Sequence, residues 1–362
     1  MLPSRLGLVS DSGSRPAQRA EDTRGGYPMN GLVPEFASHF APQTWAIVLA
    51  GGDGVRLRPL VRRLFGDERP KQFIPLLGPA SLLRQTLDRV ERLVPPERTV
   101  VVSRLEHAAH IARELSGRSR PRVLLQPQDR GTGTAVLFAA HWIRQWDPEA
   151  IVAVFPSDHF ILEEEAFSAH TGQVLAHVAN NPELMVLLGA PPTRPEPEYG
   201  WIRPGEWIGD TGAGPVFRVG GFVEKPEPER ARRCLATGWL WNTFVFATTL
   251  PALLEIGQEC LPSVDGRLKH IAAFNRTPHE SWAIRQAYAL APTCDFSRAV
   301  LQRCPPGLAV SPLPRLTWCD LGTPARVVGV VKGLSVRPPW MSGGRRTINA
   351  LASVLQELSE AN

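Results

Sequence analysis

The sequence is poor in cysteine, in lysine and in long apolar runs, and these shortages exclude whole classes of protein. Its five cysteines form no C-x-x-C pair and leave one over, which argues against a disulfide framework and against a structural zinc site. No apolar run approaches the ~20 residues that a bilayer-spanning helix needs. We therefore expect a cytoplasmic protein without a membrane partner.

The charge balance is also modest. Lys and Arg together number 40 against 35 Asp and Glu, a formal charge of +5 over 362 residues. This excess is too dilute for a nucleic-acid-binding surface, so we expect no nucleic acid partner. Only four of the cations are lysines. Because a compact ammonium group suits a tight phosphate site, Lys71 and Lys225 become candidates, whereas Lys269 and Lys332 are attributed to chance.

The hydrophobic pattern divides the chain into three parts. Residues 1–44 show no helical or strand period and are predicted to be a disordered leader, with Met29 an alternative start. From Trp45, apolar runs alternate with helical periods. Strands are expected at 44–50, 99–103, 122–127, 151–159 and 185–190, and helices at 81–94, 106–115, 132–146 and 163–178.

This alternation requires parallel pairing through crossover helices. We predict an α/β fold with a doubly wound, mostly parallel sheet over 45–190, followed by a smaller mixed α+β lobe over 191–335 and a helical tail over 336–362. Ligands of such sheets lie at the carboxyl ends of the strands. The functional loops should therefore follow Ala50, Gln126, Phe155 and Ala190.

The first of these loops is rich in glycine. Gly51-Gly52-Asp53-Gly54 precedes Val55 and Arg56, so backbone N–H groups and one cation could hold a phosphate. The loop is not G-x-G-x-x-G and lacks the Gly-Lys-Ser/Thr of a P-loop, so neither a dinucleotide dehydrogenase nor a P-loop kinase is supported. Alone, it is as compatible with a structural turn.

Further motifs narrow the interpretation. The chain contains GG-x-G-x-R-L-x-P-L at 51–60, P-K-Q-F at 70–73, P-S-D-H at 156–159, Y-G-W-I at 199–202, F-V-E-K-P at 222–226, W-N-T at 241–243 and W-x-D-L-G at 318–322. In this order they resemble the sugar-1-phosphate nucleotidyltransferases, and P-K-Q-F with P-S-D-H is most similar to mannose-1-phosphate guanylyltransferases. The resemblance covers about Trp45 to Lys332. It implies a nucleotide-diphospho-sugar transferase fold and a reaction in which a hexose-1-phosphate attacks the α-phosphorus of a nucleoside triphosphate.

The resemblance also implies roles for individual residues. Arg56 would hold the leaving pyrophosphate, Lys71 would neutralise the α-phosphate, and Asp158 and Asp320 would bind Mg²⁺. The implied nucleotide-binding residues are Gly51, Gly52, Gly54, Gln126 and Gly131, and the implied sugar-phosphate residues are Gly200, Glu224, Lys225 and Asn242.

Three departures from the guanylyltransferase pattern leave the substrates open. Gly131-Thr132-Gly133 lies where that pattern has an acidic residue followed by Arg-Asn-Thr, and Val55 lies where the first motif commonly has threonine. Pro197-Glu198 lies before Tyr199, where Thr-Gly is more usual. GTP with mannose-1-phosphate is the favoured pair, and UTP or dTTP with glucose-1-phosphate is the alternative.

Two other function classes are weaker. A silent nucleotide-sugar-binding homologue should lack the charged set that this chain retains, and a glycosyltransferase should carry a D-x-D pair, which Ser157-Asp158-His159 does not supply. A homodimer is left open.

Overall fold

A computed structural model describes residues 43–117, 120–333 and 338–340. The leader predicted over 1–44 therefore lies outside the described residues except for its last two, and Thr44 already begins the first strand. The helical tail predicted over 336–362 likewise lies outside them except for 338–340.

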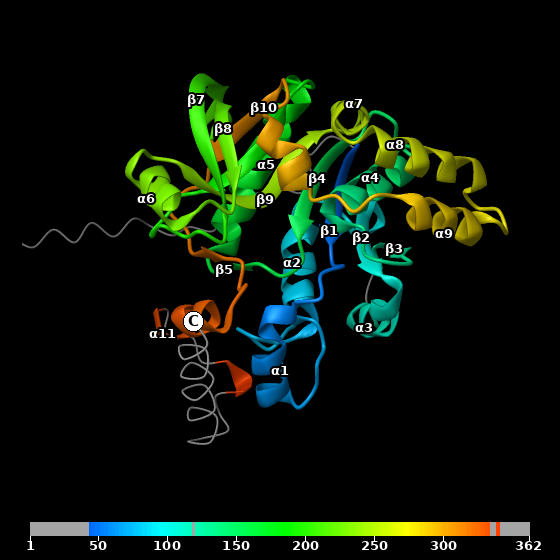
Figure 1. Cartoon of the computed structure of the whole chain (residues 1–362), viewed down its shortest axis with the longest axis horizontal. Coiled ribbons are helices and arrows are strands. Elements are labelled where there is room, and N and C mark those ends of the chain that lie inside the picture. Colours follow the sequence, from blue (N-terminus) through cyan, green and yellow to red (C-terminus); the bar gives the residue numbers. More distant parts are fainter. Residues whose placement is uncertain (1–42, 118–119, 334–337, 341–362) are drawn as a thin grey trace, which may run out of the picture. The chain divides into compact units, whose positions relative to one another are not determined.

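The first half of the chain builds a parallel sheet (Figure 1). Strand β1 pairs with β2 on one side and with β4 on the other, and β2 pairs with β3, all in parallel. Ala46 and Val48 of β1 face one hydrophobic cluster, whereas Trp45 and Ile47 face a second. Both faces of the strand are thus covered, which explains its unbroken apolar run. The bounds are β1 Thr44–Leu49, β2 Thr99–Arg104, β3 Arg122–Gln126 and β4 Ile151–Pro156.

The strands of the second half extend the same sheet. The order is β3-β2-β1-β4-β9-β6-β10-β8-β7. Strand β9 lies antiparallel to both β4 and β6, while β10 is parallel to β6. The predicted α/β class is confirmed. Strand β6 was expected to continue the parallel first half, but it lies antiparallel to β9 and pairs in parallel with β10 of the second half. These strands are β6 Met185–Ala190, β7 Gly200–Asp210, β8 Pro215–Glu224, β9 Leu240–Thr249 and β10 Leu308–Pro312.

Helices cover the sheet. Ser81 caps α2, its hydroxyl accepting a hydrogen bond from the Arg84 backbone N–H at 3.1 Å. Helices were expected near α2, α3, α4 and α5, whereas α1 and α7 to α9 were not predicted. The bounds are α1 Arg58–Phe65, α2 Leu82–Glu91, α3 Ala108–Glu114, α4 Gly131–Ile143, α5 Glu164–Asn180, α6 Pro228–Ala236, α7 Leu250–Cys260, α8 Pro262–Lys269, α9 Glu280–Leu290, α10 Phe296–Ala299 and α11 Pro324–Gly333.

Two contacts join the C-terminal part of the described chain to earlier segments near the functional loops. Strands β5 (Phe160–Ile161) and β11 (Trp318–Cys319) form an antiparallel pair. Helices α1 and α11, blue and orange-red in Figure 1, contribute to one hydrophobic cluster. These contacts bring the loops after β4 and β11 together.

Two further observations concern membrane crossing and disulfides. Within the described ranges, no helix has both the length and the apolar character that a membrane crossing demands. All five cysteines lie in those ranges as free thiols. The expectation that the chain lacks a disulfide framework agrees with this.

Candidate functional site

The glycine-rich loop after β1 is shaped by the P-K-Q-F segment. Gln72 donates from Nε2 to the carbonyl oxygens of Ala50 at 3.1 Å and Gly52 at 2.7 Å. Gly54 has φ 58°, and a Cβ there would lie 3.1 Å from the Lys71 backbone nitrogen. Position 54 therefore needs glycine for two reasons: the left-handed backbone conformation and the close approach of the Lys71 backbone.

Lys71 brings two of the predicted catalytic residues together. Its Nζ lies 3.1 Å from Asp158 Oδ2 and donates to the Asp320 backbone oxygen at 2.5 Å. The Lys71 side chain is only 11% exposed. A buried ammonium group is thus balanced by Asp158 at the point where the loops after β4 and β11 meet.

Asp320 lies in a dense network that the sequence did not reveal. Its Oδ1 accepts from the Tyr199 hydroxyl at 2.9 Å, from the Gly322 N–H at 3.0 Å and from Arg326 at 2.9 Å. Oδ2 accepts from Arg326 at 2.8 Å. Arg326 also pairs with Glu196 at 2.8 Å and lies over the Tyr199 ring. The network fixes the carboxylate of Asp320 in one orientation.

The ionisation of Asp320 suits a cation site. Burial opposes its charge, but Lys71, Arg326 and His159 together lower its pKa below the ordinary value. Among the described residues, Asp320 Oδ2 accepts a hydrogen bond from Arg326 alone. Asp158 Oδ1 is 3.9 Å from His159 Nε2, which is beyond hydrogen-bond distance. Both oxygens therefore have lone pairs left. Carboxylate oxygens of this kind are the ligands that Mg²⁺ prefers.

His159 links the two loops. Trp318 Nε1 donates to His159 Nδ1 at 3.3 Å. Burial lowers the pKa of His159 to about 4, so the ring is neutral at physiological pH. Because Nδ1 accepts, the ring proton is on Nε2, the nitrogen that faces Asp158. W-x-D-L-G and P-S-D-H are therefore joined by a side-chain contact as well as by β5 and β11.

The predicted sugar-phosphate residues also converge. A Cβ on Gly200 would lie 2.6 Å from Glu224 Oε2 and 3.1 Å from Asn242 Cβ. Gly200 therefore has no room for a side chain, and β7, β8 and β9 each contribute one wall. Lys225 follows Glu224 with φ 49°, and its Nζ is 4.0 Å from Glu224 Oε1. Its side chain is 45% exposed, far more than that of Glu224 at 10%.

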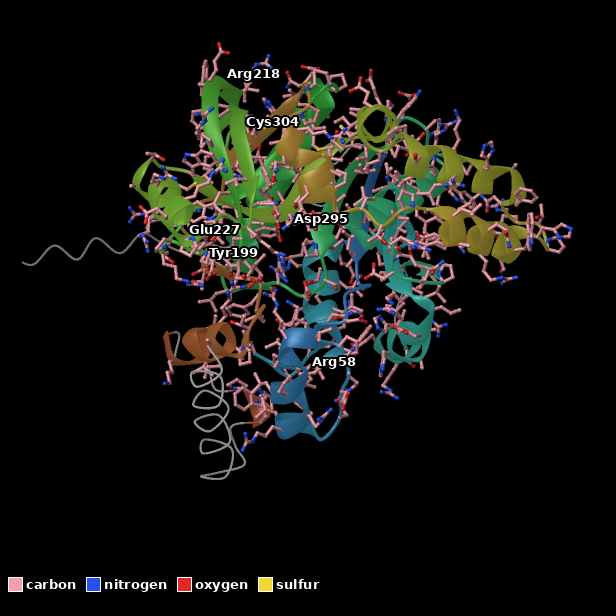
Figure 2. All side chains as sticks on the ribbon, in the orientation of Figure 1. Arg58, Tyr199, Arg218, Glu227, Asp295 and Cys304 are labelled. Atoms are coloured by element: carbon pink, nitrogen blue, oxygen red, sulfur yellow. The ribbon has the colours of Figure 1, made fainter. Side chains whose placement is uncertain are left out.

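Glu224 has an unusual environment. Its pKa is raised to about 7, first by burial and then by Asp295 (labelled in Figure 2), while Lys225, Arg298 and Ser297 act in the opposite direction. Asp295, Ser297 and Arg298 belong to the segment around α10, which the sequence motifs did not include.

Arg56 lies at the edge of the same region. Its guanidinium pairs with Glu198 at 2.6 Å, and both side chains are about half exposed, at 51% and 48%. A Cβ on Gly322 would lie 2.5 Å from Asp320 Oδ2 and 3.2 Å from Arg56. Arg56 is thus next to Asp320, held by an exposed ion pair that is weak in water and that a phosphate could replace.

The predicted nucleoside-binding residues lie at the ends of β1 and β3. Gln126 is buried, and its Oε1 accepts from the Tyr288 hydroxyl at 3.1 Å. A Cβ on Gly51 would lie 3.2 Å from Gln126 Nε2. Gly131 has φ 79°, and the backbone carbonyl of Cys294 occupies the space of its missing side chain. The close approach at Gly131 thus comes from the chain itself.

Residues 45–332 match the family described as "Nucleotidyl transferase". The chain belongs to this family, as the sheet and the ordered motifs indicated.

Several named proteins are similar to it. The xanthan biosynthesis protein XanB of Xanthomonas campestris pv. campestris (strain B100) is 33% identical over 281 residues, covering 76% of this chain and 57% of that protein. A mannose-1-phosphate guanylyltransferase of Escherichia coli (strain K12) is 30% identical, covering 77% and 58%. The chain thus spans little more than half the length of these relatives. A crystal structure described as mannose-1-phosphate geranyltransferase from Thermus thermophilus superposes with a TM-score of 0.66 at 34% identity, covering 77% of this chain and 76% of that one.

Proposed function

We propose that this chain transfers a nucleoside monophosphate from GTP to mannose-1-phosphate, giving GDP-mannose and pyrophosphate. The observation that carries the proposal is the convergence of Lys71, Asp158 and Asp320 beside the glycine-rich loop. Relatives named for guanylyl transfer support the choice of substrates. We also place the reaction in the cytoplasm, since the cysteines are free thiols.

The reaction brings two polyanions together, so positioning and charge neutralisation dominate. An oxygen of the sugar phosphate attacks the α-phosphorus, and the bond to the β-phosphate oxygen breaks. Lys71 neutralises the α-phosphate, and Arg56 leaves Glu198 to hold the departing pyrophosphate. The backbone N–H groups of Gly51, Gly52 and Gly54 bind the triphosphate.

Asp158 Oδ1 and Asp320 Oδ2 would hold Mg²⁺, which when bound neutralises phosphate charge. The hydrogen bonds to Asp320 from Tyr199, Arg326 and Gly322 keep its carboxylate in place as substrates arrive. Glu224 and Asn242 would bind sugar hydroxyls, and Gly200 would leave the room that the Glu224 side chain needs beside it. Lys225 would bind the sugar phosphate.

The experiment is a pyrophosphate-release assay with Mg²⁺. It uses GTP, ATP, CTP, UTP and dTTP, each with mannose-1-phosphate, with glucose-1-phosphate and without a sugar. We expect release that requires both GTP and mannose-1-phosphate. Sugar-dependent release with UTP or dTTP and glucose-1-phosphate would support the alternative pair, and absence of release in every combination would contradict the proposed activity.

A further inference from the structure

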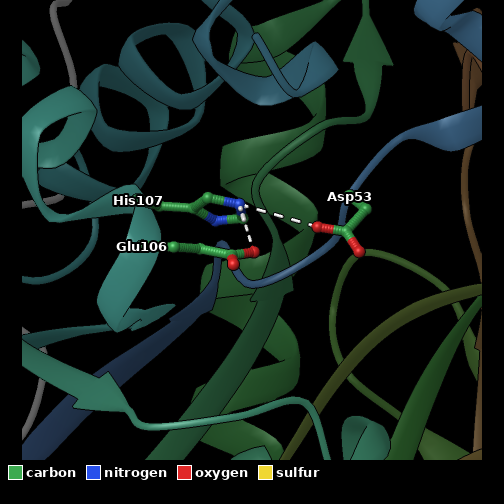
Figure 3. Close-up of side chains that lie close together, drawn as sticks. All are labelled: Asp53, Glu106 and His107. Atoms are coloured by element: carbon green, nitrogen blue, oxygen red, sulfur yellow. Dashed lines mark ion pairs between the residues drawn. The ribbon is translucent and has the colours of Figure 1, made fainter. Parts of the chain in front are cut away.

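A compact cluster of titratable side chains lies beside the glycine-rich loop (Figure 3). Asp53 comes from the loop, and Glu106 and His107 come from the turn between β2 and α3. His107 Nε2 lies 3.6 Å from Asp53 Oδ1 and 3.5 Å from Glu106 Oε1. The three ligand atoms lie within 4.8 Å of one another, a spacing that a metal ion could bridge.

The cluster already contains a cation of its own. Arg104, the last residue of β2, lies 2.5 Å from Asp53 Oδ1 through one terminal nitrogen and 2.5 Å from Glu106 Oε1 through the other. Burial, aided by Arg104, lowers the pKa of His107, so its ring is neutral. Both carboxylates are therefore engaged by a fixed guanidinium, and the cluster holds an arginine in position rather than a metal ion.

Arg104 is held where a nucleoside should lie. The register of β2 and β3 places it directly beside Gln126. A Cβ on Gly51 would lie 3.8 Å from Arg104 Cγ and 3.2 Å from Gln126 Nε2. All three residues are at carboxyl ends of parallel strands, the edge at which doubly wound sheets bind ligands.

Both side chains offer donors at this edge. An arginine side chain has five N–H donors and no acceptor. In Arg104, Asp53 and Glu106 each accept from one of these donors, so three remain for a ligand. One of these, Nε, is buried without a hydrogen-bond partner in the part of the chain that the structure describes. The Gln126 carbonyl is bound by Tyr288, which leaves its NH₂ group on the side of Gly51. A base edge recognised here must therefore present acceptors.

We infer that Arg104, with Gln126, selects guanine by donating hydrogen bonds to its O6 and N7 atoms. Guanine presents two adjacent acceptors on that edge, whereas adenine presents N7 beside an amino donor, cytosine an amino donor and thymine one carbonyl beside a methyl group. This inference rests on the proposed function and names the residue that sets its base specificity.

The test compares nucleotide binding and turnover in the wild type with those in Arg104→Gln and Arg104→Lys. The lysine variant keeps the charge beside Asp53 and Glu106 but removes the planar fork. Arg84→Gln is the matched control, because Arg84 is also an ion-paired arginine with little exposure, 13% against 17%, but lies on α2 and pairs with Asp88. Thermal melting verifies that each variant is folded.

Dissociation constants are measured by calorimetry for GTP, ITP, 7-deaza-GTP and ATP, and kcat/KM is measured with the same nucleotides and mannose-1-phosphate. In the wild type and in Arg84→Gln, ITP should resemble GTP because it keeps O6 and N7, and 7-deaza-GTP should bind about tenfold more weakly. Both Arg104 variants should lose about 10- to 100-fold of the preference for GTP over ATP, together with the penalty for 7-deaza-GTP.

Equal weakening of all nucleotides in the Arg104 variants, or a wild type that does not distinguish 7-deaza-GTP from GTP, would overturn the inference. A preference of the wild type for UTP or dTTP in the pyrophosphate-release assay would also overturn it while leaving nucleotidyl transfer intact. If no nucleotide is turned over, the proposed function fails, and the calorimetric comparison still decides whether Arg104 selects guanine.

Discussion

The charged residues of the site balance one another before any substrate is present. Lys71 is paired with Asp158, and Arg326 with Asp320 and Glu196. Buried charges that are matched and hydrogen-bonded in this way are held in position at moderate cost, whereas removal of one partner leaves the other unpaired. The two carboxylates that we propose as Mg²⁺ ligands are therefore already held in position.

Asp158→Asn tests the role of the carboxylate at the end of β4. We expect kcat to fall by about 10²- to 10³-fold, because an electrostatic contact to the reacting phosphates is lost. Pyrophosphate release is measured over a range of Mg²⁺ concentrations, with Asp210→Asn, an exposed position at the end of β7, as the control. Turnover near the wild-type value in Asp158→Asn at saturating Mg²⁺ would show that this carboxylate does not take part.

Glu224→Gln tests the buried carboxyl group of the proposed sugar-binding region. The folded chain raises the pKa of Glu224 from 4.5 to about 7, so between these values the folded state keeps a proton that the unfolded chain releases. Stability of the wild type should therefore fall from pH 4.5 to 7 relative to the variant, by up to about 3 kcal/mol, and the difference should stay constant above pH 7.

The measurement is the free energy of unfolding in urea at pH 5 and at pH 8 for both proteins. Glu206→Gln is the control, because the Glu206 side chain is 78% exposed. A difference between wild type and Glu224→Gln that does not change with pH would contradict the raised pKa.

At the scale of elements, the N-terminus of α4 is fixed by the segment that precedes α10. Cys294 donates its N–H to the Arg130 carbonyl at 3.0 Å, and its own carbonyl accepts from the Gly133 N–H at 3.1 Å. Thr132 accepts from the Phe296 N–H at 2.9 Å. A loop predicted for nucleobase contact is thus also a junction between two distant parts of the chain.

Gly131→Ala should weaken this junction. The residue has φ 79°, and a Cβ would overlap the Cys294 carbonyl, so we expect a loss of at least about 2 kcal/mol in the free energy of unfolding. Gly266→Ala in α8 is the matched control, since no atom lies within 4 Å of the added Cβ and alanine favours a helix. The free energy of unfolding of both variants and of the wild type is measured by chemical denaturation. Equal values for Gly131→Ala and Gly266→Ala would contradict the account.

The sequence predicts those elements whose apolar pattern is regular. The run 44–50 became β1, and the Ser81 signal marked the start of α2 within one residue. Helices α7 to α9 were not predicted; in α7 and α8 the apolar pattern is broken by Pro251, Gly257 and Pro262, which are unfavourable in helix interiors. Their packing depends on tertiary contacts, such as that between Leu137 of α4 and Gly257 of α7.

For the whole molecule, the motifs identified residues that the fold brings together, but not their partners. Lys71, Asp158 and Asp320 could be named from the chain because they lie in recognisable motifs. Tyr199 could not be assigned to Asp320, because it is 121 residues away in the sequence and meets it only in the fold. Arg326 is only 6 residues from Asp320, but it belongs to none of the motifs. Arg104, beside the glycine-rich loop, was also missed, because it belongs to none of the motifs.

The central claim is that the α-phosphate of the nucleotide moves to the sugar phosphate. The most direct measurement incubates the protein with Mg²⁺, mannose-1-phosphate and GTP labelled in either the α- or the γ-phosphate, and follows both labels into the separated products. We predict that the α-label appears in GDP-mannose and the γ-label in pyrophosphate, and that Asp158→Asn strongly slows both. Transfer of the γ-label to the sugar, or release of label that does not depend on the sugar phosphate, would contradict the account.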